Sequence, residues 1–410
     1  MRLLVLSQYF WPESFRVNDL VSALAERGHE VTVLTGVPNY PDGRVYREYL
    51  ADKPRYSTYG SVPVVRVPLV PRGAGGPLRL ALNYLSFVVT GTTLGVWRLR
   101  GRPFDAVLVH QPSPITACLP ALLIGRVKRA PVLLWTLDLW PETLEALGAV
   151  RSRMGLAAMG RLVSFIYRRC ALVLGQSRAF RESVARHAGS EAKFRYFPQW
   201  TERIFDGRGQ TIEAAPEVRA FDDTFNVLFA GNIGEAQDFP AIIEAAEKVK
   251  ARTDLRWLIV GDGRAAHWLK DEVARRDLSD RVHLLGRHPI ERMPSFFRGA
   301  GALLVSLKGE PVFALTIPGK VQSYLASGVP LLGMLDGEGA RVIEEAGAGL
   351  TCPAGNGAAL AANVERLADM PAAERAAMGR RAIAYAEREF DRDRLLSQLE
   401  EWLREVRTPR

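Results

Sequence analysis

Short apolar runs alternate along the chain with longer amphipathic stretches. The first run, residues 2–7, reads Arg-Leu-Leu-Val-Leu-Ser, which is typical of a strand buried on both faces. Residues 18–27 then predict a helix that ends at Gly28. Further strands are expected at residues 30–35, 106–109, 131–135 and 172–174, with a helix over residues 113–127. This alternation of strands and helices predicts a parallel, doubly wound sheet.

A second series of the same kind begins after residue 205. Strands are expected at residues 226–230, 256–260, 282–285, 301–305 and 329–332, and helices at 240–251, 267–276 and 320–326. The charged, amphipathic pattern of residues 372–406 also predicts helix. We therefore expect an α/β protein with two Rossmann-like doubly wound domains, at residues 1–200 and 205–385, facing a central cleft. The final helix, at about residues 388–410, can pack back on the first domain.

The composition is that of an ordinary globular chain. Of 410 residues, 48% are hydrophobic and 24% are charged, which excludes a disordered or fibrous protein. The three cysteines, Cys118, Cys170 and Cys352, form no CxxC motif, so a disulfide framework and a structural zinc site are not expected. The strand-like start predicts no signal peptide, and we expect a cytoplasmic protein.

The charge is basic, +9 with a pI near 9.6, and it favours an anionic partner. Residues 66–102 hold six arginines and residues 151–181 hold seven, and neither stretch contains an acidic residue. The apolar run 80–97 inside the first stretch is interrupted by Thr and Gly, which disfavours a membrane span. Two interpretations stay open: a buried helix with a basic rim, or a peripheral face resting on anionic lipid. Nucleic acid ranks last because the arginines flank aliphatic runs rather than stacking aromatics.

Three segments of the second half suit phosphate binding. Residues 231–234 (GNIG) and 260–263 (VGDG) each follow a predicted strand, where glycine lets a ligand approach the backbone. Residues 318–320 (PGK) open a helix with free amides and a lysine. A cation at a helix N-terminus opposes the dipole, so Lys320 indicates a nearby anion. We predict a diphosphate site there, with an ordinary helix cap as the alternative.

Polar residues in the first half follow strands at the same edge of the sheet. Asp138 and Glu142 suit general acid–base work, although a carboxylate after a strand is equally often a helix cap. The other candidates at this edge are Arg16, Asn18, Asn39 and Tyr40. Because the carboxyl ends of parallel strands share one edge, we expect all of them to face one cleft.

Taken in order, these pieces resemble the retaining glycosyltransferases of family 4, which have the GT-B fold. The resemblance is carried by QYFWPESFRVNDLVSALAERGHEVTVLT, VPNYPDGRVY, LDLWPE, LFAGNIGEAQDFPAIIEAA, LIVGDG and TIPGKVQSYLASGVPLL. The NYP, DLWPE, GNIG and TIPGK series is more narrowly similar to the branch that builds bacterial surface polysaccharides on lipid carriers. The resemblance implies transfer of a hexosyl or N-acetylaminosugar group from a nucleotide diphosphate donor, expected to be UDP, to a lipid-linked or polysaccharide acceptor with retention.

The chain departs from the family pattern at several positions. Asn232 and Gln237 stand where many members have Arg and Lys, and Ser323 stands at the second of two paired glutamates. Lys320 is therefore expected to supply most of the stabilisation of the leaving-group charge, with Asp138 beside the transferred sugar. The implied donor-binding residues are Asn232, Gly234, Gln237, Gly261, Gly263, Glu310, Gly319, Val321 and Ser323. The implied acceptor-side residues are Arg16, Asn18, Asn39, Tyr40 and Glu142.

The expected partners follow from this reading: a nucleotide-sugar, a polyprenyl-linked acceptor and the anionic inner face of the plasma membrane. No metal or other cofactor is expected, because the protein supplies the countercharge, and no nucleic acid. Two other functions stay open. A nucleotide-sugar 2-epimerase would need several acid–base groups and no lipid-facing surface. A non-catalytic nucleotide-sugar-binding subunit is suggested by Ser323 and the missing Arg and Lys.

Overall fold

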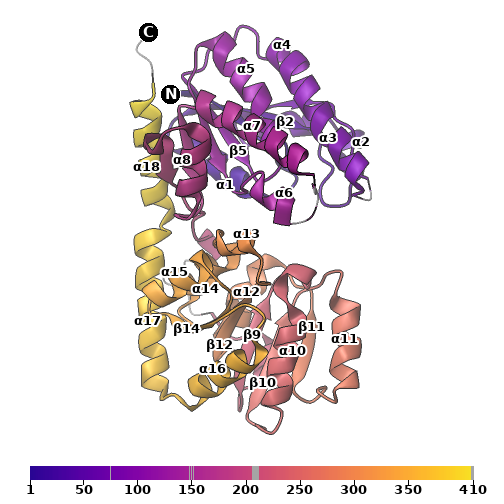
Figure 1. Cartoon of the computed structure of the whole chain (residues 1–410), viewed down its shortest axis with the longest axis vertical. Helices are drawn as coiled ribbons and strands as arrows, with labels where there is room; N and C mark the ends of the chain where they lie inside the picture. Colours follow the sequence, from indigo (N-terminus) through magenta and orange to yellow (C-terminus); the bar gives the residue numbers. More distant parts are fainter. Residues whose placement is uncertain (74, 147, 149, 151, 206–211, 408–410) are drawn as a thin grey trace. The chain divides into compact units, whose positions relative to one another are not determined.

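The computed structural model describes the chain except residues 74, 147, 149, 151, 206–211 and 408–410. The chain divides into two compact units, Met1–Pro198 with Asp393–Arg410, and Gln199–Arg392. In each unit, helices cover a largely parallel sheet (Figure 1). This arrangement confirms the predicted class, an α/β protein with two Rossmann-like units.

Within the described residues, the sheet of the first unit has the strand order β3-β4-β2-β1-β5-β6-β7-β8. Its strands are β1 (Arg2–Leu6), β2 (Glu30–Gly36), β3 (Thr58–Tyr59), β4 (Val62–Val67), β5 (Ala106–Gln111), β6 (Val132–Thr136), β7 (Leu172–Gly175) and β8 (Phe194–Tyr196). Its helices are α1 (Arg16–Glu26), α2 (Arg47–Ala51), α3 (Pro77–Thr90), α4 (Val96–Arg98), α5 (Cys118–Lys128), α6 (Glu142–Ala146), α7 (Arg153–Arg169) and α8 (Phe180–Ala188). A π-helical stretch, Gly91–Gly95, joins α3 to α4.

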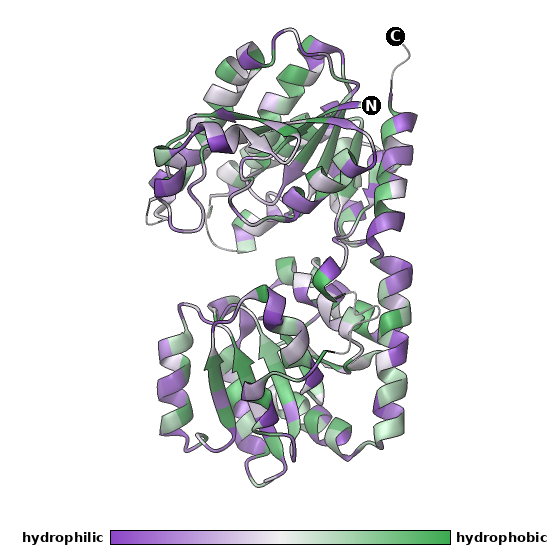
Figure 2. Ribbon diagram, turned by 180° about the vertical axis from the view of Figure 1, so that it is seen from behind, coloured by the Kyte–Doolittle hydropathy of each residue, from purple (hydrophilic) through white to green (hydrophobic). Residues whose placement is uncertain are grey.

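The sheet of the second unit has the strand order β11-β10-β9-β12-β13-β14 among the described residues. Its strands are β9 (Phe225–Ala230), β10 (Leu255–Val260), β11 (Val282–Gly286), β12 (Ala302–Ser306), β13 (Leu331–Met334) and β14 (Gly349–Cys352). Its helices are α9 (Pro216–Arg219), α10 (Phe239–Lys248), α11 (Ala266–Arg275), α12 (Met293–Arg298), α13 (Pro311–Ala314), α14 (Gly319–Ser327), α15 (Glu338–Glu345), α16 (Gly357–Asp369) and α17 (Ala372–Glu389). Figure 2 shows the strands of both sheets as predominantly apolar, as expected for strands covered on both faces.

Most predicted strands lie where the pattern placed them, and the differences have local causes. The strand expected at residues 329–332 begins only at Leu331, because Pro330 has no N–H to donate to the ladder. Strand β4 has no counterpart in the prediction, since Pro63 and Arg66 interrupt its apolar run. The helix expected over residues 372–406 is broken: α17 ends at Glu389, and α18 (Arg392–Glu405) follows.

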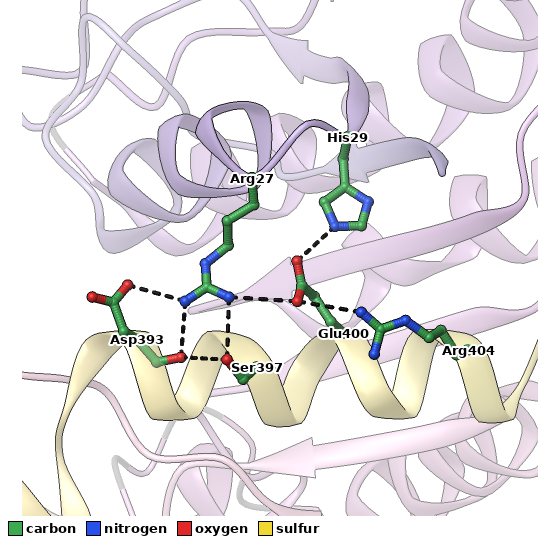
Figure 3. A network of polar contacts seen from close by, with 6 residues as sticks. All are labelled: Arg27, His29, Asp393, Ser397, Glu400 and Arg404. Carbon is green, nitrogen blue, oxygen red and sulfur yellow. Dashed lines mark hydrogen bonds and ion pairs between the residues drawn. The ribbon is translucent and has the colours of Figure 1, made fainter.

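Helix α18 belongs to the first unit and is held there by a polar network (Figure 3). Arg27, which caps α1, donates to Ser397 Oγ at 3.2 Å and pairs with Glu400 at 3.4 Å. The other oxygen of Glu400 lies 2.9 Å from His29 Nε2. On the apolar side of the helix, Trp402 meets Phe197 edge to face, with ring centroids 5.8 Å apart. Both Glu400 oxygens are therefore engaged, and this carboxylate ties α18 to the segment between α1 and β2.

The basic stretch 66–102 is divided between interior and surface. Arg66 is buried and donates to the backbone carbonyls of Tyr56, Gly36 and Trp11, and burial lowers its pKa to about 10. It therefore cannot belong to a lipid-facing surface, which corrects that part of the expectation. Arg151, from the second stretch, lies outside the described residues.

The apolar run of the first stretch is not a buried helix either. Within α3 only Asn83 and Phe87 are buried, whereas Leu78 is 75% exposed and Leu85 is 59% exposed. Residues 77–98 form the one segment, among those described, that is long and apolar enough to cross a membrane by length and composition. Only 22% of that segment's apolar window is buried. The buried-helix interpretation is therefore wrong.

Replacing Glu400 tests the attachment of α18. We expect Glu400→Ala to destabilise the helix locally by about 1–2 kcal/mol, because Arg27 and His29 lose a charged acceptor at a site with little water. Hydrogen–deuterium exchange of the peptides from α18 should become about 5- to 30-fold faster. Glu401→Ala, on the exposed face of the same helix, is the matched control. Equal exchange in the two variants would contradict this role.

Candidate functional site

Lys320 lies in the first turn of α14 with its ammonium directed into the second unit. Its Nζ is shut off from solvent, although other atoms of the residue reach the surface. The Nζ lies 3.7 Å from the centroid of the Phe229 ring, a cation–π contact. Among the described residues it has no hydrogen-bond partner. Burial lowers the pKa of Lys320 to about 7, since desolvation penalises the charged form.

Tyr324, one turn further along α14, determines where Lys320 lies. The buried Tyr324 hydroxyl donates to the Ala230 carbonyl at 3.1 Å and accepts from the Ala230 N–H at 2.9 Å. Side chains four residues apart share one helix face, so Lys320 lies over the residues that follow Ala230. A Cβ atom on Gly231 would be only 3.0 Å from Lys320 Nζ. The end of β9 and the start of α14 thus form one joined site.

The loops after β9 and β10 meet at two glycines. Gly231 and Gly261 have φ values of 144° and 149°, in the region that favours glycine. A Cβ on Gly261 would lie 1.8 Å from the Gly231 carbonyl oxygen, so no larger residue fits there without displacing the backbone. The glycines therefore hold two βα loops in contact at the carboxyl edge of the sheet, the usual ligand-binding edge of α/β folds.

Two neutral amides flank this turn. Asn232 Nδ2 and Gln237 Oε1 would lie 2.5 Å and 3.1 Å from a Cβ on Gly234. Asn232 Oδ1 would lie 2.7 Å from a Cβ on Gly263. Gln237 Oε1 is buried and has no hydrogen-bond partner among the described residues. The structure thus gathers Asn232, Gly234, Gln237, Gly261 and Gly263 at one turn.

The remaining donor candidates lie in different environments. Gly319 is exposed at the first turn of α14, and a Cβ there would meet no atom within 4 Å, so its backbone borders open space. Ser323 is buried further along α14. The side chain of Val321 packs in the apolar core, which leaves only its backbone for a ligand. Glu310 is exposed and precedes the first turn of α13.

At the carboxyl edge of the first unit, Glu13 organises the loops. Its carboxylate accepts hydrogen bonds from the backbone N–H groups of Phe10 (3.1 Å), Asn39 (2.7 Å) and Tyr40 (2.8 Å). Burial raises the pKa of Glu13, and the bonds from these amides oppose that shift. The loop after β1 is therefore fastened to the loop after β2. Sequence reasoning missed this residue, whose signal is an acid inside an otherwise apolar and aromatic loop.

Some of the predicted acceptor-side residues hold loops in place, and others lie at the surface. Asn18 accepts from the Trp11 N–H and donates to the Glu13 carbonyl. Asn39 is fully buried and accepts from the Arg72 N–H at 3.1 Å. These two residues therefore position the loops. Tyr40 is 37% exposed. Arg16 is partly exposed at the start of α1.

Asp138 fits the alternative of a local cap, whereas Glu142 bonds to a distant helix, α8. Asp138 accepts from Trp140 Nε1 at 3.0 Å and from Thr143 Oγ1, and burial raises its pKa. Glu142 accepts from Ser183 Oγ at 2.6 Å with one oxygen, and its other oxygen is buried with no partner among the described residues. Asp138 thus stabilises its own loop, and Glu142 retains a free acceptor.

His110 and Gln111, at the end of β5, were not singled out from the sequence. Ser7 Oγ donates to the Tyr9 carbonyl, so His110 Nδ1 is the donor in the 3.3 Å contact with that oxygen. His110 Nε2 and Gln111 Nε2 are buried with no partner among the described residues. Burial lowers the pKa of His110 to about 3, so the ring is neutral. The signal in the sequence was this pair of polar residues directly after an apolar run.

Comparisons with known proteins place both units among glycosyltransferases. A family model described as "Glycosyl transferase 4-like domain" matches residues 14–200. A second, "Glycosyl transferases group 1", matches residues 224–370. The chain is 25% identical over 342 residues to the putative colanic acid biosynthesis glycosyl transferase WcaI of Escherichia coli K12, covering 80% of this chain and 82% of WcaI.

Solved structures give the same fold. Anabaena Alr3699/HepE in complex with UDP matches with a TM-score of 0.72 at 14% identity, covering 99% of this chain and 100% of that chain. WaaG, a glycosyltransferase involved in lipopolysaccharide biosynthesis, matches with a TM-score of 0.67 at 15% identity, covering 98% of this chain and 99% of that chain. With a glycosyltransferase model matching each unit and this fold throughout, the chain is a glycosyltransferase of the GT-B fold.

Proposed function

We propose that this glycosyltransferase moves a sugar from a UDP-linked donor to a lipid-linked acceptor, with retention, in the synthesis of a cell-surface polysaccharide. One observation carries the proposal: the buried ammonium of Lys320, which has no hydrogen-bond partner in the described part of the chain, lies beside a glycine turn at the carboxyl edge of the second sheet. Similarity to WcaI supports the polysaccharide, and the UDP complex of HepE supports the nucleotide.

The second unit supplies the donor side of this reaction. The bond between the sugar's anomeric carbon and the diphosphate breaks, its electron pair stays on the diphosphate oxygen, and a bond to the acceptor oxygen forms as the acceptor hydroxyl gives its proton to the departing diphosphate. Negative charge grows on the departing diphosphate, where Lys320 and the open amides near Gly319 would stabilise it. Asn232 and Gln237 would add neutral hydrogen bonds. Because Lys320 supplies the countercharge, the proposed transfer needs no metal.

The first unit supplies the acceptor side and the membrane contact. The exposed face of α3 includes Leu78 and Leu85, and Trp97 beyond it is 58% exposed with the Arg100 guanidinium 4.2 Å from its ring centroid. On α7, the exposed Phe165 is paired in the same way with Arg169, at 3.7 Å. Apolar side chains paired with cations suit the boundary of an anionic bilayer. We place this surface on the cytoplasmic leaflet.

The central test incubates the chain with labelled nucleotide-sugars and membranes carrying polyprenyl-linked acceptors. A labelled lipid product in which the anomeric configuration of the donor is retained supports the proposal. Free epimerised sugar would instead indicate a 2-epimerase, and binding without turnover would indicate a non-catalytic subunit. Addition of EDTA should leave the rate unchanged.

Replacing Lys320 separates its functional role from a structural one. We expect Lys320→Met to lower turnover by about 100-fold or more, since the leaving group loses an oriented cation in a closed site. The melting temperature should stay the same or rise, because methionine fills the space without burying an unpaired ammonium. Lys270→Met, on the exposed face of α11, is the control. Near-normal turnover would contradict the assignment.

The pH dependence of UDP affinity gives a second test of Lys320. A bound diphosphate favours the protonated lysine, so the pKa of Lys320 should rise from about 7 in the free chain when UDP binds. Affinity is then highest below about pH 7 and falls by up to about tenfold per pH unit above it. Calorimetry from about pH 6 to about pH 8, roughly one unit on either side of that pKa, measures this. A slope that persists in Lys320→Met would assign it to another group.

Liposome flotation tests the membrane surface. Wild type should bind anionic vesicles, and Leu78→Glu/Leu85→Glu should lose binding at every salt concentration. Charge reversals, Arg98→Glu/Arg100→Glu/Arg102→Glu and Arg168→Glu/Arg169→Glu, should weaken binding at low salt. Their effect should vanish near 1 M salt, where the Debye length is about 3 Å. Trp268→Glu, on α11 of the second unit, is the control. Equal partitioning of all these proteins would rule out this surface.

A further inference from the structure

A cavity of about 560 Å³ lies between the loops that follow β2 and β4 in the first unit. Its lining includes Asp42, Gly43, Arg44, Pro71, Gly73 and Arg79. The volume falls within the range of small-molecule sites, about 300–1,000 Å³. None of the residues assigned above to donor or acceptor lines it, so it is a separate candidate site.

The backbone around the cavity is locked in place. The Gly43 N–H donates to the Asn39 carbonyl at 2.8 Å, and the Gly73 N–H donates to the Gly43 carbonyl at 2.9 Å. Both glycines have positive φ, 71° and 61°, and a Cβ on Gly43 would lie 1.8 Å from the Gly73 carbonyl oxygen. The two loops therefore cross at a point where only glycine fits. The cavity is preformed, and Asn39 connects it to the loops that Glu13 fastens.

The charge of the cavity favours an anion. Arg44 and Arg79 are exposed to it, and neither has a hydrogen-bond or ion-pair partner among the described residues. Asp42 is the one acidic residue in the lining. Arg72, between the lining residues Pro71 and Gly73, does not line the cavity, and its guanidinium lies 5.1 Å from the centroid of the Tyr40 ring. Guanidinium groups bind phosphate oxygens in a bidentate way, so paired arginines suit a phosphate or diphosphate.

The same helix that carries Arg79 presents an apolar surface. Arg79 lies in the first turn of α3, and its neighbour Leu78 is 75% exposed. Leu82 and Leu85 follow and are also exposed, at 41% and 59%. A ligand that satisfies both features has an anionic head for the cavity and a hydrocarbon chain for the face of α3. That is the chemistry of a lipid diphosphate.

We propose that this cavity binds the diphosphate of the lipid-linked acceptor, with Arg44 and Arg79 as its ligands and the hydrocarbon chain along α3. This inference rests on the proposed function, which requires such an acceptor. The inference adds to that function a binding site for the lipid end of the acceptor. The sugar to be extended would then point from the cavity toward Tyr40 and Arg72.

Calorimetric titration with farnesyl diphosphate tests the site, with UDP present at saturation so that the donor site is filled. Wild type should bind, and Arg44→Gln/Arg79→Gln should weaken binding by about tenfold or more. Arg47→Gln, an exposed arginine of α2 outside the cavity, should bind like wild type. Farnesol and inorganic pyrophosphate should each bind more weakly than farnesyl diphosphate, since each offers half of the ligand. UDP affinity should be the same in all variants.

Unchanged affinity in the double variant, or no binding by wild type, would overturn the inference. Equal binding of dihexanoylphosphatidylglycerol, lost in the same double variant, would also overturn it and assign the cavity to a phospholipid headgroup. Sugar transfer is measured separately in the membrane assay, so a failure of the proposed function is recognised independently of this titration.

Discussion

The buried ammonium of Lys320, which has no hydrogen-bond partner among the described residues, is the constraint on which the second unit depends. Burying an unpaired cation is costly, and most proteins avoid it by pairing the group or exposing it. Here Tyr324 fixes α14 to the end of β9, and the ammonium lies over the Phe229 ring with no hydrogen-bond partner among the described residues. Under the proposed function, binding of the donor diphosphate offsets this cost. A buried, unpaired lysine beside a glycine turn is therefore better explained by a ligand than by stability.

The first unit also buries a charged group, in this case a carboxylate. Glu13 is buried, and its carboxylate accepts hydrogen bonds from three backbone N–H groups. It therefore holds the loops together instead of binding a ligand. Fastening these loops leaves Tyr40 at the surface and stacks Arg72 beside it. The contact between Gly43 and Gly73 extends the same framework to the cavity that these loops line with Arg79 of α3. Rigid loops of this kind lower the entropy lost when an acceptor is bound.

The positions of the charged side chains in the structure are more informative than their number along the sequence. Six arginines in residues 66–102 predicted one basic face, yet Arg66 serves the interior by binding three carbonyls. The exposed members are accompanied by exposed apolar side chains, Leu78 and Leu85 among them. The combination of charge and exposed apolar area, rather than charge alone, distinguishes a lipid-facing surface from an ordinary solvated one.

The two α/β units and the motifs at their edges could be predicted from the pattern of residues alone. Strands covered on both faces must be continuously apolar, and a helix that starts with Pro-Gly-Lys can be recognised in the sequence. The sequence did not reveal Glu13 or His110, or the cavity at Arg44 and Arg79, because each depends on loops from distant parts of the chain meeting in space. It also could not show that Asp138 caps its own loop or that α3 is exposed. Periodicity reports which side of an element is apolar, and only tertiary packing decides whether another element covers that side.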